Sequence, residues 1–370
     1  MRVIRALKTV NYRLWIAILV TMLLPTVYQT IRFFFLGNMP SDNGINIASQ
    51  LQWVNLFYEV IQEALILPLF FLLGKSLMYI EELANKVRTG LVVTAGIYLL
   101  VSIVIISCAR PLVVLMAQED ALVDATVAYV RLETIAALFS TLWRFMSLVL
   151  VTIKKDRHLY IVLGVQMILS VLLDTFLVSN LDVSAKLGVN GIAYTNMIVN
   201  AALVIISILL LFHENINLCS KTKWNFNWLK DWFKVGKYSG LESFLRNLAF
   251  MVMVVRMTNV VSEQGNYWLA NGFIWNWLLL PGLALADLVK KEVGENKDNI
   301  QNKTFGYLIL TSIFAGLWLL SIPIWKPFLQ YVMNVENYET VFNIVLIETG
   351  FYITFLFNSC IFDSTFYGLG

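Results

Sequence analysis

The sequence predicts an all-α, polytopic membrane protein made of two similar helix bundles. Hydrophobic residues make up 59% of its 370 residues and charged residues only 14%, and the mean hydropathy is +0.72. A soluble domain of this size would be about half apolar and about a quarter charged. Long apolar runs and a regular alternation of basic loops predict the same class, because each run is long enough to cross a bilayer as a helix.

Ten segments contain the roughly 20 mostly apolar residues that a spanning helix needs. The first of these segments does not have the pattern of a signal peptide, because it is too long and no small-residue cleavage site follows it. The predicted spans are 14–36, 51–74, 90–109, 132–153, 160–180, 190–213, 235–260, 266–289, 305–325 and 340–367.

Lysine and arginine are concentrated in every second loop. Nineteen of the 27 basic residues precede the first span or follow spans two, four, six and eight. The opposite side holds few basic residues, among them Arg110, Lys186, Arg256 and Lys326. The positive-inside rule therefore places the N-terminus and the even-numbered loops in the cytoplasm.

The longest predicted cytoplasmic loop, 214–234, divides the chain into two bundles. We expect residues 1–220 to form an N-terminal bundle of six helices and residues 221–370 a C-terminal bundle of about four. Corresponding spans lie about 218 residues apart, as in transporters built from structural repeats. If the second bundle copies the first, two helices are missing, and we expect the chain to be truncated by roughly 60–80 residues.

The sequence gives no sign of enzyme chemistry. The three cysteines are scattered, and the P-loop, HExxH, GxSxG and GxGxxG motifs are absent. We therefore expect neither an enzyme, a metal centre nor a cofactor. Any movement of a solute would have to draw on a gradient of a coupling ion, H⁺ or Na⁺.

Several ionisable side chains occur at predicted membrane depth, where charge is costly and is often functional. A receptor or a membrane anchor would not need so many, whereas a path through the bilayer would. They are Arg32, Glu59, Glu63, Glu133, Arg144, Asp174, Glu242, Arg246 and Glu348.

Glu242 and Arg246 are four residues apart and so share one face of a helix. One interpretation is an internal ion pair that merely makes the helix insertable. The other is that Glu242 faces a water-filled cavity and exchanges a proton, a sodium ion or a cationic substrate, while Arg246 responds to its occupancy.

Glu59 and Glu63 have the same spacing but like charges. Two neighbouring carboxylates repel each other, so we expect their protonation to be coupled, which would suit a proton carrier. The alternative is that both lie near the outer mouth, solvated or paired with Arg32. Asp174 and Asn247 are further candidates, although each would serve equally well as a contact between helices.

Five phrases of the sequence resemble phrases of the multidrug and toxic-compound extrusion (MATE) transporters, in the correct order. The resemblance implies two six-helix bundles around a central cleft, and the exchange of protons or sodium for organic cations or drugs. The phrases are VLLDTFLV (171–178), LGVNGIAYTNMIVN (187–200), GLESFLRNLAF (240–250), PGLALADLVKKEVGEN (281–296) and FDSTFYGLG (362–370).

One departure from the family pattern concerns the coupling ion. The family usually carries an aspartate in the first span, a few residues before a phrase that is similar to FLG (35–37) here. The matching position is Arg32. Glu59 or Glu63 would then replace the missing carboxylate, or coupling would have moved to Glu242.

We therefore expect an ion-coupled antiporter of the cell (plasma or inner) membrane that exports small organic cations by alternating access. It would act as a monomer in contact with lipid and without nucleic acid. Two alternatives remain open: a flippase for lipid-linked oligosaccharides, whose cleft would hold phosphates through Arg32, Arg144 and Arg246, and a scaffold without transport. The candidate substrate and ion site consists of Glu242, Arg246, Asn247, Glu59, Glu63, Arg32 and Asp174.

Overall fold

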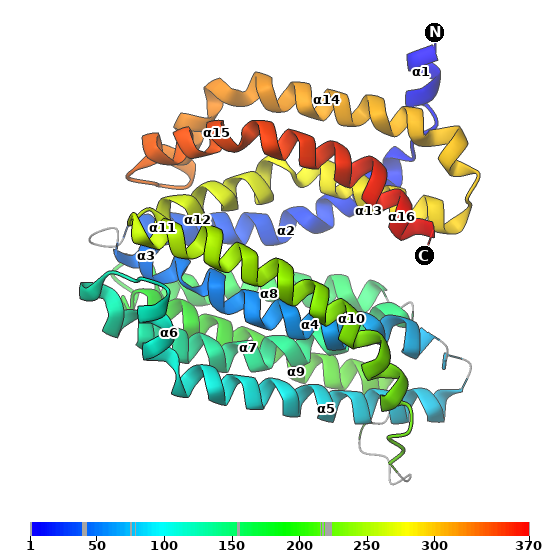
Figure 1. Ribbon diagram of the computed structural model, residues 1–370, viewed down its shortest axis with the longest axis horizontal. Coiled ribbons are helices and arrows are strands. Elements are labelled where there is room, and N and C mark those ends of the chain that lie inside the picture. Colours follow the sequence, from blue (N-terminus) through cyan, green and yellow to red (C-terminus); the bar gives the residue numbers. More distant parts are fainter. Residues whose placement is uncertain are drawn as a thin grey trace. The chain divides into compact units, whose positions relative to one another are not determined.

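The computed structural model describes residues 2–38, 43–74, 76–77, 79–153, 156–214, 216, 218 and 224–369. All regular secondary structure within these residues is helical, as the sequence predicts (Figure 1). The longer helices are α2 (Tyr12–Gly37), α4 (Leu51–Gly74), α5 (Ile80–Ser107), α7 (Val123–Thr152), α8 (Asp156–Leu177), α9 (Val189–His213), α10 (Leu229–Phe250), α12 (Gln264–Phe273), α13 (Leu280–Glu295), α14 (Asn299–Pro327) and α15 (Tyr338–Phe357).

Shorter elements extend or connect these helices within the described residues. The short α-helices are α1 (Arg2–Leu7), α3 (Asn43–Ser49), α6 (Ala109–Leu115), α11 (Arg256–Val260) and α16 (Ser364–Leu369), and η1 (Asp120–Leu122) is a 3₁₀ turn. The stretches η2 (Met251–Val255), η3 (Ile274–Leu278), η4 (Phe328–Val332) and η5 (Asn358–Asp363) are π-helical and each continues the helix before it.

Every predicted span overlaps a helix of the structure. Within the described residues, seven helices are long and apolar enough to cross a membrane, or eight if α12–η3 and α13 count as one span. That pair is bent by 55°, next to Pro281, which lacks the N–H needed to continue the helical hydrogen bonds. The predicted spans 51–74 and 235–260 correspond to α4 and to α10, η2 and α11. The chain is thus a multi-pass, all-helical membrane protein.

Contacts between residues divide the chain into two compact units. Unit 1 comprises Met1–Gly37 and Asn266–Gly370, and unit 2 comprises Asn38–Gly265. This division differs from the predicted one at residue 220, which followed chain order. Helix α2 belongs to the predicted N-terminal bundle but lies in unit 1, because it packs on α13. Helix α10 belongs to the predicted C-terminal bundle but lies in unit 2, because it packs on α4.

Polar side chains fix α2 within unit 1. The Gln29 side-chain oxygen accepts a hydrogen bond from the Asn276 amide at 3.0 Å. The Trp277 indole N–H donates to the Thr30 hydroxyl, also at 3.0 Å. These bonds join the middle of α2 to the π-helical stretch η3. Specific hydrogen bonds therefore hold α2 against helices from late in the chain. A division of the chain by sequence order does not predict such bonds.

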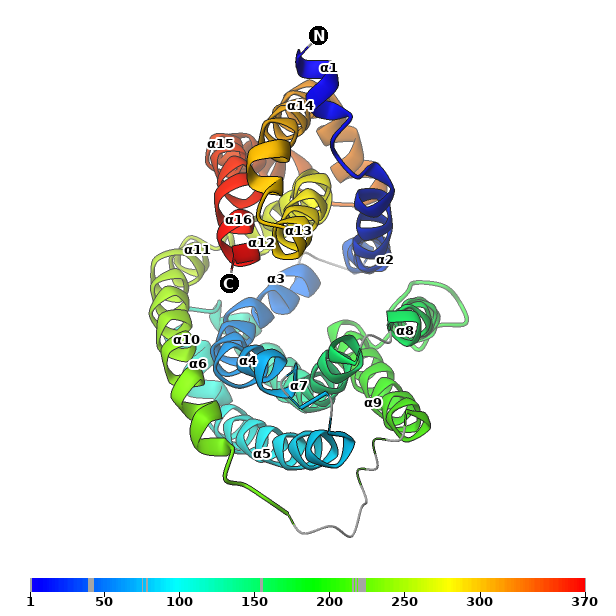
Figure 2. The same ribbon diagram turned by 90° about the vertical axis from the view of Figure 1, so that its right-hand side faces the viewer.

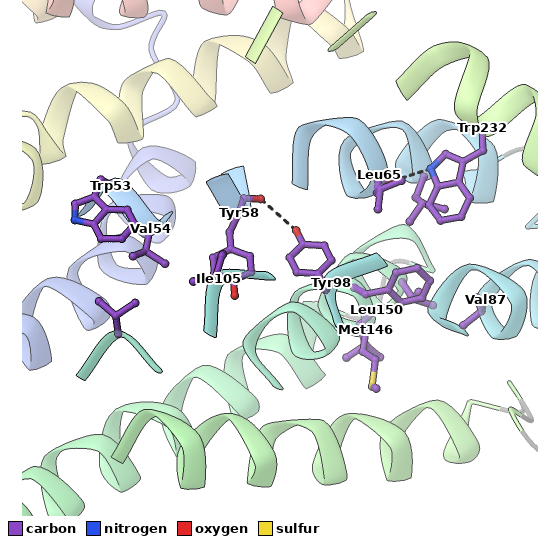
Figure 3. Packing of buried hydrophobic residues seen from close by; sticks show 14 of the residues in the cluster. Trp53, Val54, Tyr58, Leu65, Val87, Tyr98, Ile105, Met146, Leu150 and Trp232 are labelled. Atoms are coloured by element: carbon purple, nitrogen blue, oxygen red, sulfur yellow. Dashed lines mark hydrogen bonds between the residues drawn. The ribbon is translucent and has the colours of Figure 1, made fainter. Parts of the chain in front are cut away.

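Unit 2 is arranged around α4. This helix lies between α10 and α7, while α9 packs on α7 and α8 packs on α9 (Figure 2). Figure 3 shows two hydrogen bonds within its apolar core. The Trp232 indole donates to the Leu65 carbonyl oxygen at 2.7 Å, and the Tyr98 hydroxyl donates to the Tyr58 carbonyl oxygen at 3.3 Å. These bonds attach α10 and α5 to α4 and so limit the rotation of α4.

Close approach of α10 to α4 depends on glycine. A Cβ atom added at Gly236 would overlap the Ala64 carbonyl oxygen, and one added at Gly240 would lie 2.7 Å from the Ala64 Cβ atom. Small residues at such spacing let the backbones of membrane helices come together. The Ser239 hydroxyl also donates to the Glu63 carbonyl oxygen at 2.8 Å. The acidic face of α4 therefore lies directly against α10.

We predict that Gly236→Ala destabilises the protein, because the new methyl group meets backbone that cannot move without separating α10 from α4. The expected loss is about 1–3 kcal/mol, as for overpacking elsewhere. Gly96→Ala on α5 is the matched control, since its Cβ would meet nothing within 4 Å. Thermal unfolding in detergent measures both. Equal stability of the two variants would contradict the close packing.

Candidate functional site

Arg246 of α10 holds three carboxylates at once. Its Nη1 atom lies 2.9 Å from Glu242 Oε1. Its Nη2 atom lies 3.0 Å from Glu63 Oε1 and 3.2 Å from Glu59 Oε1. The guanidinium presents five donors in a planar fork, which is why one arginine can serve several acceptors. We name Glu59, Glu63, Glu242 and Arg246 the Arg246 cluster.

The Arg246 cluster carries surplus negative charge. With every group ionised, three carboxylates face one guanidinium, which leaves a net charge of −2. Surplus charge is costly in a membrane environment, and uptake of protons or binding of a cation would reduce it. The side chains are accessible to such partners, since their exposed fractions range from 26% for Glu63 to 64% for Glu242.

A polar cavity of about 430 Å³ adjoins the cluster, within the size range of small-molecule sites. Glu59 and Glu63 belong to both, so the carboxylates that bind Arg246 also face the cavity. Helices α4, α5 and α7 form the walls, and Ala137 is the one lining side chain without a polar atom among the described residues. The lining residues are Asn55, Tyr58, Glu59, Gln62, Glu63, Tyr98, Ala137, Ser140, Thr141 and Arg144.

Arg144 of α7 supplies the positive charge of the cavity wall. Its Nη1 atom donates to the side-chain oxygen of Gln62, one turn of α4 from Glu59. Gln62 is neutral, and no carboxylate of the described residues forms an ion pair with Arg144. The cavity thus has carboxylates on α4 and a guanidinium on α7 that forms no ion pair with them.

The other predicted site residues lie elsewhere. Asn247 is 5% exposed, and its amide donates to the Leu56 carbonyl oxygen at 3.3 Å, so it joins α10 to α4. Asp174 is buried in α8 and does not line the cavity. Arg32 belongs to unit 1, where its guanidinium lies 5.9 Å from the centre of the Tyr28 ring. Within unit 2 the partner of Glu59 and Glu63 is Arg246.

The site predicted from sequence lacks most of the residues that line the cavity. The sequence predicts Arg144 at membrane depth but does not identify the residues next to it. Gln62 carried a weak signal, because it lies between the two glutamates on α4. Tyr98, Ser140 and Thr141 carried none, since single hydroxyl groups in apolar helices usually bond to the helix itself or to a neighbouring helix.

We predict that Arg246→Gln lowers the free energy of unfolding most at low ionic strength, because three carboxylates then lack their cation. The expected loss at about 0.01 M salt is about 1–2 kcal/mol, below the roughly 3–5 kcal/mol of a fully buried pair, since the side chains are partly exposed. At about 1 M salt the loss should shrink, because salt screens interactions between partly exposed charges. Thermal unfolding at both salt concentrations measures the difference.

The matched control is Arg246→Lys, which keeps the charge but not the fork of donors, so its loss should be intermediate. A difference between the wild type and Arg246→Gln that does not change with salt concentration would show that the ion pairs do not stabilise the structure.

The sequence matches no protein-family model, and no curated protein matches it. Solved structures, however, have a similar fold. An inward-facing conformation of a multidrug resistance MATE family transporter of the MOP superfamily aligns over 93% of this chain and 82% of its own, with a TM-score of 0.70 and 15% identity. An outward-facing conformation of a transporter so described aligns over 97% and 82%, with a TM-score of 0.60 and 16% identity.

A third similar structure is a MOP superfamily transporter from Pyrococcus furiosus. It aligns over 100% of this chain and 85% of its own, with a TM-score of 0.64 and 16% identity. That protein is described by the reverse polarity of its binding pocket, which suggests a different function for it. At such identities the likeness concerns the fold and not the substrate. The chain therefore has the multi-pass helical fold of the MATE family transporters of the MOP superfamily, as the resemblance of its sequence implied.

Proposed function

We propose that the chain is a secondary transporter of the cell membrane that exchanges H⁺ or Na⁺ for small organic cations at the Arg246 cluster. The observation that carries this proposal is the cluster itself, in which three carboxylates share one guanidinium beside an accessible polar cavity. The similarity of the fold to MATE transporters supports the class of protein.

The surplus negative charge provides a mechanism for exchange. Glu59 and Glu63 face the cavity, so a proton, a sodium ion or the ammonium group of a solute reaches the same oxygen atoms. Occupancy by one cation halves the surplus charge that attracts the next, so each cation weakens the binding of the other. A transporter that alternates between two states then moves the two cations in opposite directions, provided that each state binds them with different affinity.

The flippase alternative is less consistent with these charges. Of the three arginines that would hold a phosphate, Arg246 is already bound by three carboxylates. A pyrophosphate approaching that guanidinium would meet a cluster with a net negative charge, and the repulsion would be large in a medium of low dielectric constant. A cationic solute meets attraction at the same place.

We predict that Glu63→Gln reduces the exchange of an organic cation at least about tenfold, because a charge-assisted interaction of about 1.5–3 kcal/mol is lost. The chain is reconstituted in lipid vesicles, and efflux of ethidium is followed by fluorescence under an imposed proton gradient and under an imposed sodium gradient. The gradient that drives efflux identifies the coupling ion.

The matched control is Glu339→Gln, which removes a carboxylate that lies 3.5 Å from Lys326 outside the cluster and should exchange ethidium like the wild type. Exchange by Glu63→Gln at the wild-type rate would remove the cluster from the mechanism. Wild-type vesicles that bind a lipid pyrophosphate but move no organic cation under either gradient would favour the flippase. Vesicles that do neither would favour the scaffold.

A further inference from the structure

The charged groups of unit 2 are divided unequally between two arginines. Arg246 is bound by three carboxylates, whereas Arg144 bonds to the neutral side chain of Gln62. Both Glu59 and Glu63 line the same cavity as Arg144, yet among the described residues they form ion pairs with Arg246 alone. The guanidinium of Arg144 therefore forms no ion pair with a carboxylate of the described residues.

An arginine at membrane depth that forms no ion pair is costly, and it is retained where it has a role. An amide oxygen satisfies one of its donors but does not neutralise its charge. The planar fork of Arg144 suits a carboxylate or a phosphate group, which it can bind through two parallel hydrogen bonds. The positive wall of the cavity thus has the chemistry of a site for an acidic group.

The α4 lining of the cavity has the complementary chemistry. Glu59 and Glu63 lie one helical turn apart on α4 and each uses its Oε1 atom for Arg246, while the surplus charge of the cluster attracts a cation. A solute with only an ammonium group would be repelled by Arg144, and a solute with only a carboxylate would be repelled by the two glutamates. A solute with both groups satisfies both walls.

We propose that the cavity of unit 2 binds a small zwitterion, with its ammonium group at Glu59 and Glu63 and its acidic group at Arg144. This inference rests on the proposed function and specifies its substrate class. The cavity of about 430 Å³ corresponds to the volume of on the order of 14 water molecules. It therefore accommodates a solute of the size of an amino acid together with some water.

Three probes of equal chain length test the proposal: 6-aminohexanoate carries both charges, hexylammonium only the positive one and hexanoate only the negative one. Binding to the purified full chain in detergent is measured by titration calorimetry. We expect the wild type to bind 6-aminohexanoate at least about tenfold more tightly than either other probe, since each of the other probes lacks one of the two charge-assisted contacts. Glycine and 4-aminobutanoate then report which spacing of the two charges fits.

Arg144→Gln should abolish this preference and should bind hexylammonium more tightly than the wild type, because the repulsion is gone. Arg144→Lys, which keeps the charge, should retain part of the preference. A wild type that prefers hexylammonium, or an Arg144→Gln variant that still prefers 6-aminohexanoate, would overturn the zwitterion. The comparison of probes on the wild type requires no variant and so does not depend on how the variants fold.

The same titrations separate this inference from the proposed function. Suppose that Glu63→Gln weakens the binding of hexylammonium, while Arg144→Gln does not change the preference for 6-aminohexanoate. The proposed cation site at Glu59 and Glu63 then stands, and only the proposal of a zwitterionic substrate fails. If Glu63→Gln leaves binding of hexylammonium and of 6-aminohexanoate unchanged, the acidic site fails and the zwitterion fails with it.

Discussion

The contact of one guanidinium with three carboxylates is the interaction on which the rest of unit 2 depends. Arg246 can reach Glu59 and Glu63 only because α10 lies against α4, and the glycines of α10 make that approach possible. The cluster balances only part of the charge that it gathers. What an insertable helix needs is a neutral pair, whereas this site retains an excess of two negative charges. That excess is the physical reason for the proposal that cations exchange at the cluster.

The cavity shows how the same carboxylates serve two surfaces. Toward α10 they bind Arg246, and on their other side they line a cavity that Arg144 of α7 also lines. Hydrogen bonds of the buried core, such as the one from Trp232 to the Leu65 carbonyl oxygen, limit the rotation of α4 and so keep both directions in place. Loss of the ion pairs with Arg246 would change the electrostatic potential in the cavity, because Glu59 and Glu63 belong to both. Binding of a charged solute in the cavity would likewise change the ion pairs.

Much of the fold was predictable from sequence, because hydrophobic length and loop charge act locally. Each of the ten apolar runs overlaps a helix, and the bend beside Pro281 lies where proline interrupts the hydrogen bonds. The pair Glu242 and Arg246 followed from helical spacing. Its contact with Glu59 and Glu63, which lie more than 180 residues earlier, did not, because it requires knowing which helices meet. The grouping of α2 with late helices escaped prediction for the same reason.

The central claim is that a cation in the cluster must leave when an organic cation enters. The most direct measurement is the release of H⁺ or Na⁺ from purified protein in weakly buffered detergent solution when an organic cation is added. The account predicts about one ion released for each solute bound, because both neutralise the same surplus charge. Binding of the solute with no release of either ion would contradict it.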